Sequence, residues 1–124
     1  MARVGREGDE LVVRLNDLEK AGALRGDVRV PLSAVRAVTV SERPFRDLRG
    51  IRAPGAGLPG VIALGTWRYR GGKDFAALYR GGPALVVELD EGAPYRRLLV
   101  SAHDAVALRE ELVADTMPAS SDTF

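Results

Sequence analysis

Four arginines recur at every third position in one short segment and are the side chains best suited to bind a ligand: Arg43, Arg46, Arg49 and Arg52. Three apolar residues alternate with them: Phe45, Leu48 and Ile51. In an extended or loosely wound segment, this spacing places guanidinium groups on one side and apolar groups on the other. An anionic surface or an acidic partner requires such an arrangement. A second interpretation also stands, in which the apolar side chains plug the core and the arginines pair with nearby acids or water.

Positive charge is concentrated around this segment. Residues 43–80 carry eight basic and two acidic side chains, a net +6, whereas residues 1–42 are balanced at seven and seven. Residues 81–124 carry three basic and eight acidic side chains, a net −5. The basic segment therefore either attracts phosphates or an acidic partner, or faces the acidic C-terminal segment within the fold.

Three further basic residues, Arg68, Arg70 and Lys73, accompany a group of aromatic residues: Trp67, Tyr69, Phe75 and Tyr79. Exposed aromatic rings beside basic side chains suit the stacking of single-stranded nucleic acid. Aromatic residues on strands more commonly form cross-strand core pairs, and we prefer that interpretation.

No combination of residues indicates catalysis. Cysteine is absent and His103 is the one histidine, so thiol chemistry and sites built from several histidines are excluded. His103 falls at the expected start of a helix, an exposed position, and the adjacent carboxylates, such as Glu110 and Glu111, lie in turns or on a helix surface. The glycine-rich run 55–60 lacks the Lys-Ser/Thr ending of a P-loop. An all-oxygen magnesium or calcium site stays open, but we predict no catalytic residue, no metal site and no cofactor.

The length and composition indicate one globular domain. The chain has 124 residues, 46% of them hydrophobic and 28% charged, which is enough to bury a core without disulfides. We expect the domain to span residues 1–115 and residues 116–124 to form a disordered polar tail. The N-terminus has no secretory pattern and no apolar run approaches the length of a membrane span, so we expect a cytoplasmic protein.

The spacing of apolar residues and turn signals predicts a β-rich fold. Strands are expected at 3–6, 11–15, 28–31, 35–40, 61–69, 73–79, 84–89 and 95–100. The first two should form a hairpin, and the last four, joined by short turns, an antiparallel meander. Residues 41–60 contain three prolines and four glycines, which predicts a long loop with a functional role or disorder.

Two helices are expected beside the strands. Asn16 and Glu19 have the spacing of a capping box at the start of a short helix, whose apolar positions Leu18, Ala21 and Leu24 should pack on the sheets. A second helix should begin after an N-cap at Ser101 and end near residue 114. Its apolar stripe comprises Ala105, Leu108 and Leu112, joined by Val106 and Val113.

Several segments resemble bacterial pleckstrin-homology-like (PH-like) domains, in particular the small stand-alone actinobacterial type. The resembling features are residues 30–35 before a strand, residues 50–66, the Lys73-Asp74-Phe75 hairpin and the passage from Leu99 to Asp104. The resemblance implies a bent antiparallel β-barrel or sandwich of about seven strands, capped by a C-terminal α-helix. Lipid-binding members have basic residues in the loop between the first two strands. Here Arg6 is followed by residues 7–10, Glu-Gly-Asp-Glu, so the resemblance gives no support to phosphoinositide binding there.

We therefore predict a non-enzymatic interaction module of PH-like fold, with its partner surface on the 43–60 loop. An unknown protein is the expected partner, and self-association through a strand edge is a further option. The alternative function is electrostatic binding of an anionic membrane surface or nucleic acid through the basic 43–80 segment, with anionic lipid favoured over nucleic acid.

Overall fold

The computed structural model describes residues 1–116, apart from the side chains of residues 53–55, 115 and 116. The described part forms two sheets. The smaller has the order β1 (Arg3–Glu7), β2 (Glu10–Arg14) and β3 (Val28–Pro31). The larger has the order β4 (Val35–Ser41), β8 (Ala84–Leu89), β9 (Arg97–Ser101), β7 (Gly72–Tyr79), β6 (Ile62–Tyr69) and β5 (Ile51–Leu58). The helices are α1 (Asp17–Ala23), α2 (Ala105–Thr116) and the short 3₁₀ helices η1 (Leu32–Ala34) and η2 (Pro44–Asp47).

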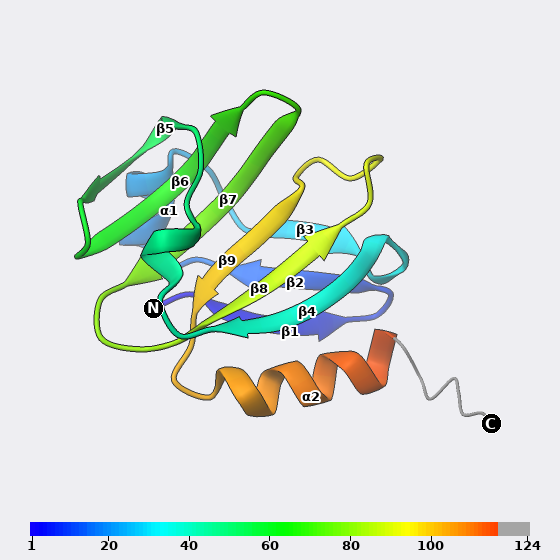
Figure 1. The fold of residues 1–124 in the computed structure, drawn as a ribbon. Coiled ribbons are helices and arrows are strands. Elements are labelled where there is room, and N and C mark those ends of the chain that lie inside the picture. The colour runs from blue at the N-terminus through cyan, green and yellow to red at the C-terminus, as the bar shows by residue number, and fades with distance from the viewer. Residues whose placement is uncertain (117–124) are drawn as a thin grey trace.

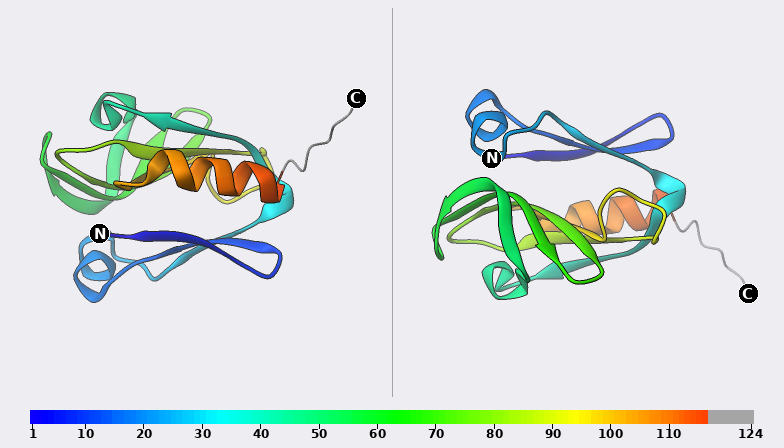
Figure 2. Two further views of the ribbon diagram at one scale, coloured as in Figure 1. Left: turned by 90° about the horizontal axis from the view of Figure 1, so that it is seen from below. Right: turned by 90° about the horizontal axis from the view of Figure 1, so that it is seen from above.

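The two sheets face each other as the layers of a sandwich (Figures 1 and 2). Alternate residues of both sheets point inward, and the main core joins residues such as Leu11 and Val30 of the small sheet to Phe75 and Leu98 of the large one. Helix α2 packs along β4 and contributes Leu112 to the same core. The mainly β fold with a C-terminal helix is confirmed, and of the two predicted forms, barrel or sandwich, the structure has the sandwich because its sheets do not close.

The strand order corrects the predicted meander. The β6–β7 hairpin is present, with Ile62 opposite Tyr79 and Tyr69 opposite Gly72. The next strand, β8, does not pair with β7 but with β4 and β9. Strand β9 returns between β8 and β7 and pairs with β7 in parallel, so the prediction of antiparallel pairing throughout is wrong. Short turns favour adjacent antiparallel strands, but the β8–β9 hairpin folds back into the place beside β7.

The capping box of α1 is confirmed, whereas its predicted apolar face is wrong. The Asn16 side chain accepts a hydrogen bond from the Glu19 amide at 2.8 Å, and the Glu19 side chain accepts one from the Asn16 amide at 2.8 Å. Leu18 and Leu24 are exposed, and Glu19 and Ala23 are buried instead. Leu24 has left-handed backbone geometry at the C-cap, which takes its side chain off the helical stripe.

Helix α2 begins later than predicted. Ser101 is not its N-cap but the last residue of β9, where the buried hydroxyl accepts a hydrogen bond from the Tyr79 amide at 2.8 Å. The predicted stripe is confirmed at Ala105 and Leu112, which are buried, while Val106 is exposed. Of the predicted disordered tail, residues 116–124, Thr116 is the last residue of α2 and the rest lies outside the described residues.

The predicted loop 41–60 is largely structured, which corrects that expectation. It contains η2 and then β5, which pairs antiparallel with β6. The pairing register shifts between Arg52 and Gly55, on either side of Pro54. Because β5 is the edge strand of its sheet, a proline and an irregular register are tolerated there.

Candidate functional site

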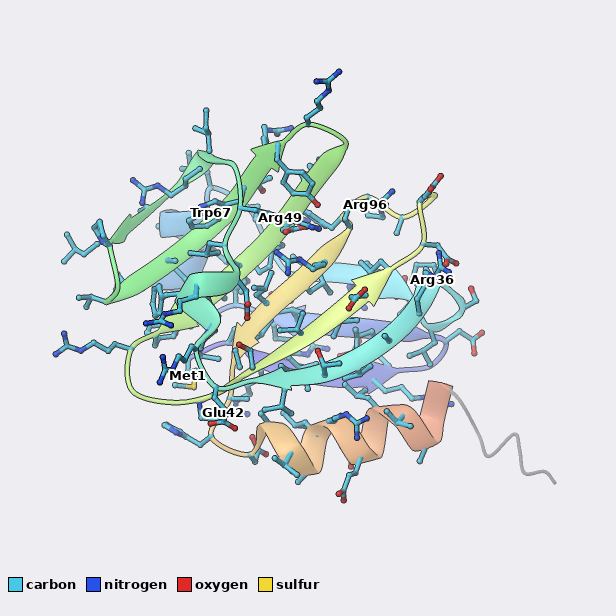
Figure 3. The ribbon with its side chains drawn as sticks, viewed as in Figure 1. Met1, Arg36, Glu42, Arg49, Trp67 and Arg96 are labelled. Atoms are coloured by element: carbon cyan, nitrogen blue, oxygen red, sulfur yellow. The ribbon has the colours of Figure 1, made fainter. Side chains whose placement is uncertain are left out.

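The outer face of the large sheet, which points away from the small sheet, carries a second apolar cluster. Strand alternation places there Ala63, Trp67, Ala76, Leu78, Ala84, Val86 and Leu99. Phe45 and Leu48, half-buried, pack against this cluster from η2 and the residues after it. The viewer of Figures 1 and 3 looks onto this face, and Figure 3 labels Trp67, Arg49 and Glu42 on it. Two of the three apolar residues of the arginine-rich segment therefore cover a sheet face.

A buried carboxylate anchors the segment to the sheet. Asp74 of β7 is 1% exposed and accepts hydrogen bonds from Arg49 Nε at 2.9 Å and from the Tyr69 hydroxyl at 2.7 Å. Arg97 of β9 donates to the same carboxylate at 2.8 and 3.0 Å and to the Asp47 carbonyl at 2.6 Å. Residues 47–49 are thus tied to two central strands of the sheet.

The charges of this cluster reinforce one another. Partial desolvation lowers the pKa of Arg49, but the hydrogen bond and charge of Asp74 outweigh it, so the pKa is raised overall. Burial raises the pKa of Tyr69, and its hydrogen bond to Asp74 raises it further. Arg49 therefore remains charged and Tyr69 remains a neutral donor at physiological pH.

An apolar hollow of about 270 Å³ opens beside this anchor. Its walls include Phe45, Leu48, Leu58, Ile62, Ala63 and Trp67, with Arg52 at its border. Among the residues that line it, Leu58 is 62% exposed, and Val61, between the lining residues Gly60 and Ile62, is 40% exposed. Ile51 is 75% exposed but stands opposite Arg68 in the β5–β6 pair, so strand alternation turns it to the face of the sheet away from Arg52 and Trp67. We call the hollow, together with Leu58 and Val61, the apolar patch.

A second hollow, of about 360 Å³, lies on the other side of Phe45. It is lined by Arg43, Arg46 and Arg80, with Glu42, Gly81 and Gly82 among the other lining residues. Phe45 lines both hollows, so the apolar patch and this basic hollow adjoin.

The four arginines of the segment therefore separate. Arg43 and Arg46 line the basic hollow, Arg52 borders the apolar hollow, and Arg49 is bound to Asp74. The structure combines the two interpretations of the sequence, since Phe45 and Leu48 cover the sheet while Ile51 and three of the arginines stay available.

The other predicted basic residues lie elsewhere. Arg68 and Lys73 are cross-strand neighbours and line a separate hollow of about 470 Å³. Arg70 lies in the turn between β6 and β7. The stacking platform, the alternative considered for the aromatic residues, does not form, because Trp67 is 7% and Phe75 0% exposed, as the preferred interpretation of core packing expects, and Phe75 packs edge-on against Tyr95.

The groups considered for catalysis stay apart. His103 is exposed and lines a hollow of about 500 Å³ with Arg3 and Asp104. Within residues 1–116, no group of three or more His, Asp or Glu side chains is placed to hold a metal ion. Asp74, Arg97 and Arg80 are the site residues that sequence reasoning missed. In β7, alternation puts Asp74 on the same face as Ala76 and opposite to Phe75. This alternation is the feature of the sequence that could have indicated a buried position for Asp74.

None of the described helices is both long and apolar enough to cross a membrane. Comparison with protein-family models, with curated proteins and with solved structures found no match to this chain.

Proposed function

We propose that this protein is a non-enzymatic binding module whose partner surface is the apolar patch on residues 43–60. The carrying observation is the exposure of Leu58 at the rim of an apolar hollow on the edge of the large sheet, with Val61 also exposed in the turn that follows β5. Removing such side chains from water contributes about 1.5–3 kcal/mol each, more than an exposed ion pair provides. A protein segment with an apolar side chain that enters the hollow is the partner that fits this surface best.

The anchoring of the segment supports the same proposal. Bonds from Arg49 and Arg97 to Asp74 hold η2 against the sheet, so the hollow exists before a partner arrives. A preformed surface loses less conformational entropy on binding than a loop that must first become ordered.

Electrostatic binding through the whole 43–80 segment has less support. Arg49 is bound to Asp74 rather than directed at a ligand, and Arg68 and Lys73 line a hollow different from that of Arg43 and Arg46. A flat anionic surface needs its basic contacts on one side of the protein.

The pleckstrin-homology-like assignment is part of this proposal. A β-sandwich followed by a C-terminal helix supports it. The parallel β7–β9 pair departs from the antiparallel pairing that the resemblance implies.

The test is chemical cross-linking of the tagged protein in host extract, with adducts identified by mass spectrometry. We expect a specific protein adduct that Leu58→Glu abolishes. Val106→Glu is the matched control because Val106 is 58% exposed on α2, which packs on β4 and β8, and β4 is at the opposite edge of the large sheet from β5. The surface assignment would be refuted if both variants lost the adduct equally, or if both retained it. Sedimentation of the pure protein should give a mass independent of concentration, whereas dimerisation that Leu58→Glu removes would identify a second copy as the partner.

A further inference from the structure

Within residues 1–116, the three arginines of the basic hollow line the same space without forming ion pairs. In this part of the chain, Arg14 and Arg29 pair with Glu7, Arg36 with Asp90, and Arg49 and Arg97 with Asp74. Other arginines such as Arg70 are also without an ion pair there, so the shared hollow is what sets these three apart. In that same part of the chain, the guanidinium groups of Arg43, Arg46 and Arg80 have no carboxylate within ion-pair distance. Three like charges at one hollow repel one another, and this repulsion is unfavourable for the folded protein. A bound anion would offset it.

Two separate chain segments bring these arginines together. Arg43 and Arg46 belong to the turn of η2, which is closed by a hydrogen bond of 3.0 Å from the Arg46 amide to the Arg43 carbonyl. Arg80 follows β7, and its amide donates to the Val61 carbonyl at 2.9 Å. The backbone at each arginine is therefore fixed, while the side chains remain exposed to solvent.

The lining of the hollow suits a small, highly charged anion. Three arginines and Glu42 give a net charge of +2. Gly81, at φ +100°, and Gly82 present backbone without side chains, so an anion can approach it closely. Guanidinium groups donate two parallel hydrogen bonds to phosphate oxygens, and a phosphate monoester carries about −1.5 to −2 charges at neutral pH.

From this geometry we propose that the hollow formed by Arg43, Arg46, Arg80, Gly81 and Gly82 binds a phosphate monoester. The site is separate from the apolar patch, in which Leu58 lines the hollow on the other side of Phe45. A membrane headgroup and a soluble metabolite present the same chemistry, and the experiment separates these two sources.

The first measurement is a ¹⁵N NMR titration with inorganic phosphate, against sodium chloride at equal ionic strength. We expect saturable shifts of the Gly81 and Gly82 amides and of the side-chain Nε groups of the three arginines. The double variant Arg43→Gln/Arg80→Gln should raise the Kd about tenfold or more. Arg70→Gln is the control, because Arg70 is an exposed turn arginine outside the hollow, and it should leave the Kd unchanged.

Glycerol 3-phosphate and vesicles of neutral lipid with phosphatidic acid form the next two arms. Binding of the soluble ester assigns the site to small molecules, and binding of the vesicles alone assigns it to a lipid headgroup. Shifts that citrate reproduces at the same concentration would overturn the phosphate assignment. So would shifts that spread over all exposed arginines, or an equal loss in Arg70→Gln. A melting temperature of the double variant equal to that of wild type shows that the fold is intact, and Leu58→Glu should retain phosphate binding.

Discussion

At the scale of single residues, Asp74 organises the candidate site. Its buried carboxylate is shared by two guanidinium groups, from Arg49 before β5 and from Arg97 at the start of β9. A carboxylate buried without such partners would be costly, whereas here donors surround both oxygens. Asp74 therefore fixes the position of the 43–60 segment on the sheet, although this segment is rich in glycine and proline.

Replacing this carboxylate should therefore weaken the whole protein. Asp74→Asn keeps the shape of the side chain but leaves Arg97, which is 16% exposed, without its counter-charge. We expect the free energy of unfolding in urea to fall by about 3 kcal/mol. Asp90→Asn is the control, because Asp90 and Arg36 form an exposed pair at 3.6 Å, and it should change stability by less than about 0.5 kcal/mol. Similar losses in the two variants would contradict the anchoring role of Asp74.

The sequence could indicate Arg49 as a functional candidate but not identify its partner. The pairing depends on how η2 lies on the sheet and on the register of β6 with β7, where Asp74 stands opposite Trp67. Neither follows from spacing along the chain. Arg80 was missed for a related reason, since it joins Arg43 and Arg46 only after Val61 fixes the β7–β8 turn.

At the scale of elements, Gly50 determines how the segment enters β5. Its φ is +86°, and a Cβ built on it would lie 2.1 Å from the Arg68 carbonyl oxygen and 2.8 Å from the Tyr69 Cβ. Residue 50 must therefore be glycine for β5 to begin beside β6 in the observed register.

Gly50→Ala is thus expected to destabilise the protein by about 2 kcal/mol or more, through strain at positive φ and through displacement of β5. Gly26→Ala is the matched control, since a Cβ there meets no atom within 4 Å. Thermal unfolding of both variants gives the comparison. A loss in Gly50→Ala no larger than that in Gly26→Ala would contradict the close packing of residue 50 on β6.

The elements that the sequence predicted well are those with regular alternation and clear turns. Strands β3 and β8 have the predicted bounds, and the β6–β7 hairpin was placed within one residue at each end. Strand β5 was missed because Pro54 and its neighbouring glycines argue against a strand, and only its position at an edge removes the penalty. In α1, helical spacing favoured Leu18 and Leu24, but the helix presents Ala23 and Glu19 to the interior.

At the scale of the whole molecule, the strand order could not be predicted. A chain of short turns is consistent with a meander, and nothing in the turn between β7 and β8 indicates that β9 will later occupy the space beside β7. Long-range pairing of this kind is decided by which arrangement buries both faces of the central strands. Here it gives β7 and β9 an interior face against the small sheet and an outer face under Phe45 and Leu48.

The two layers are joined by a polar contact as well as by the core. Glu19 of α1 is 1% exposed, and its carboxyl group accepts a hydrogen bond of 2.5 Å from the hydroxyl of Tyr79, on β7 of the large sheet. The amino group of Met1 lies 3.6 Å from the same carboxyl oxygen. Burial raises the pKa of the Tyr79 phenol well above its usual value, and the bond to Glu19 raises it further.

This contact predicts how stability depends on alkaline pH. The unfolded chain releases the Tyr79 proton near pH 10.0, whereas the folded protein retains it to higher pH. The contribution of Tyr79 is therefore complete below about pH 10 and decreases as the pH rises further, because the unfolded state then binds fewer protons. In Tyr79→Phe the free energy of unfolding should fall by about 1.5 kcal/mol at neutral pH, and the alkaline decrease should become shallower. The measurement is urea unfolding of both proteins between neutral pH and about pH 11. Tyr69 is present in wild type and in Tyr79→Phe, so the difference between their free energies of unfolding isolates the effect of Tyr79. If this difference stayed constant across the pH range, the bond between the layers would not contribute to the alkaline decrease.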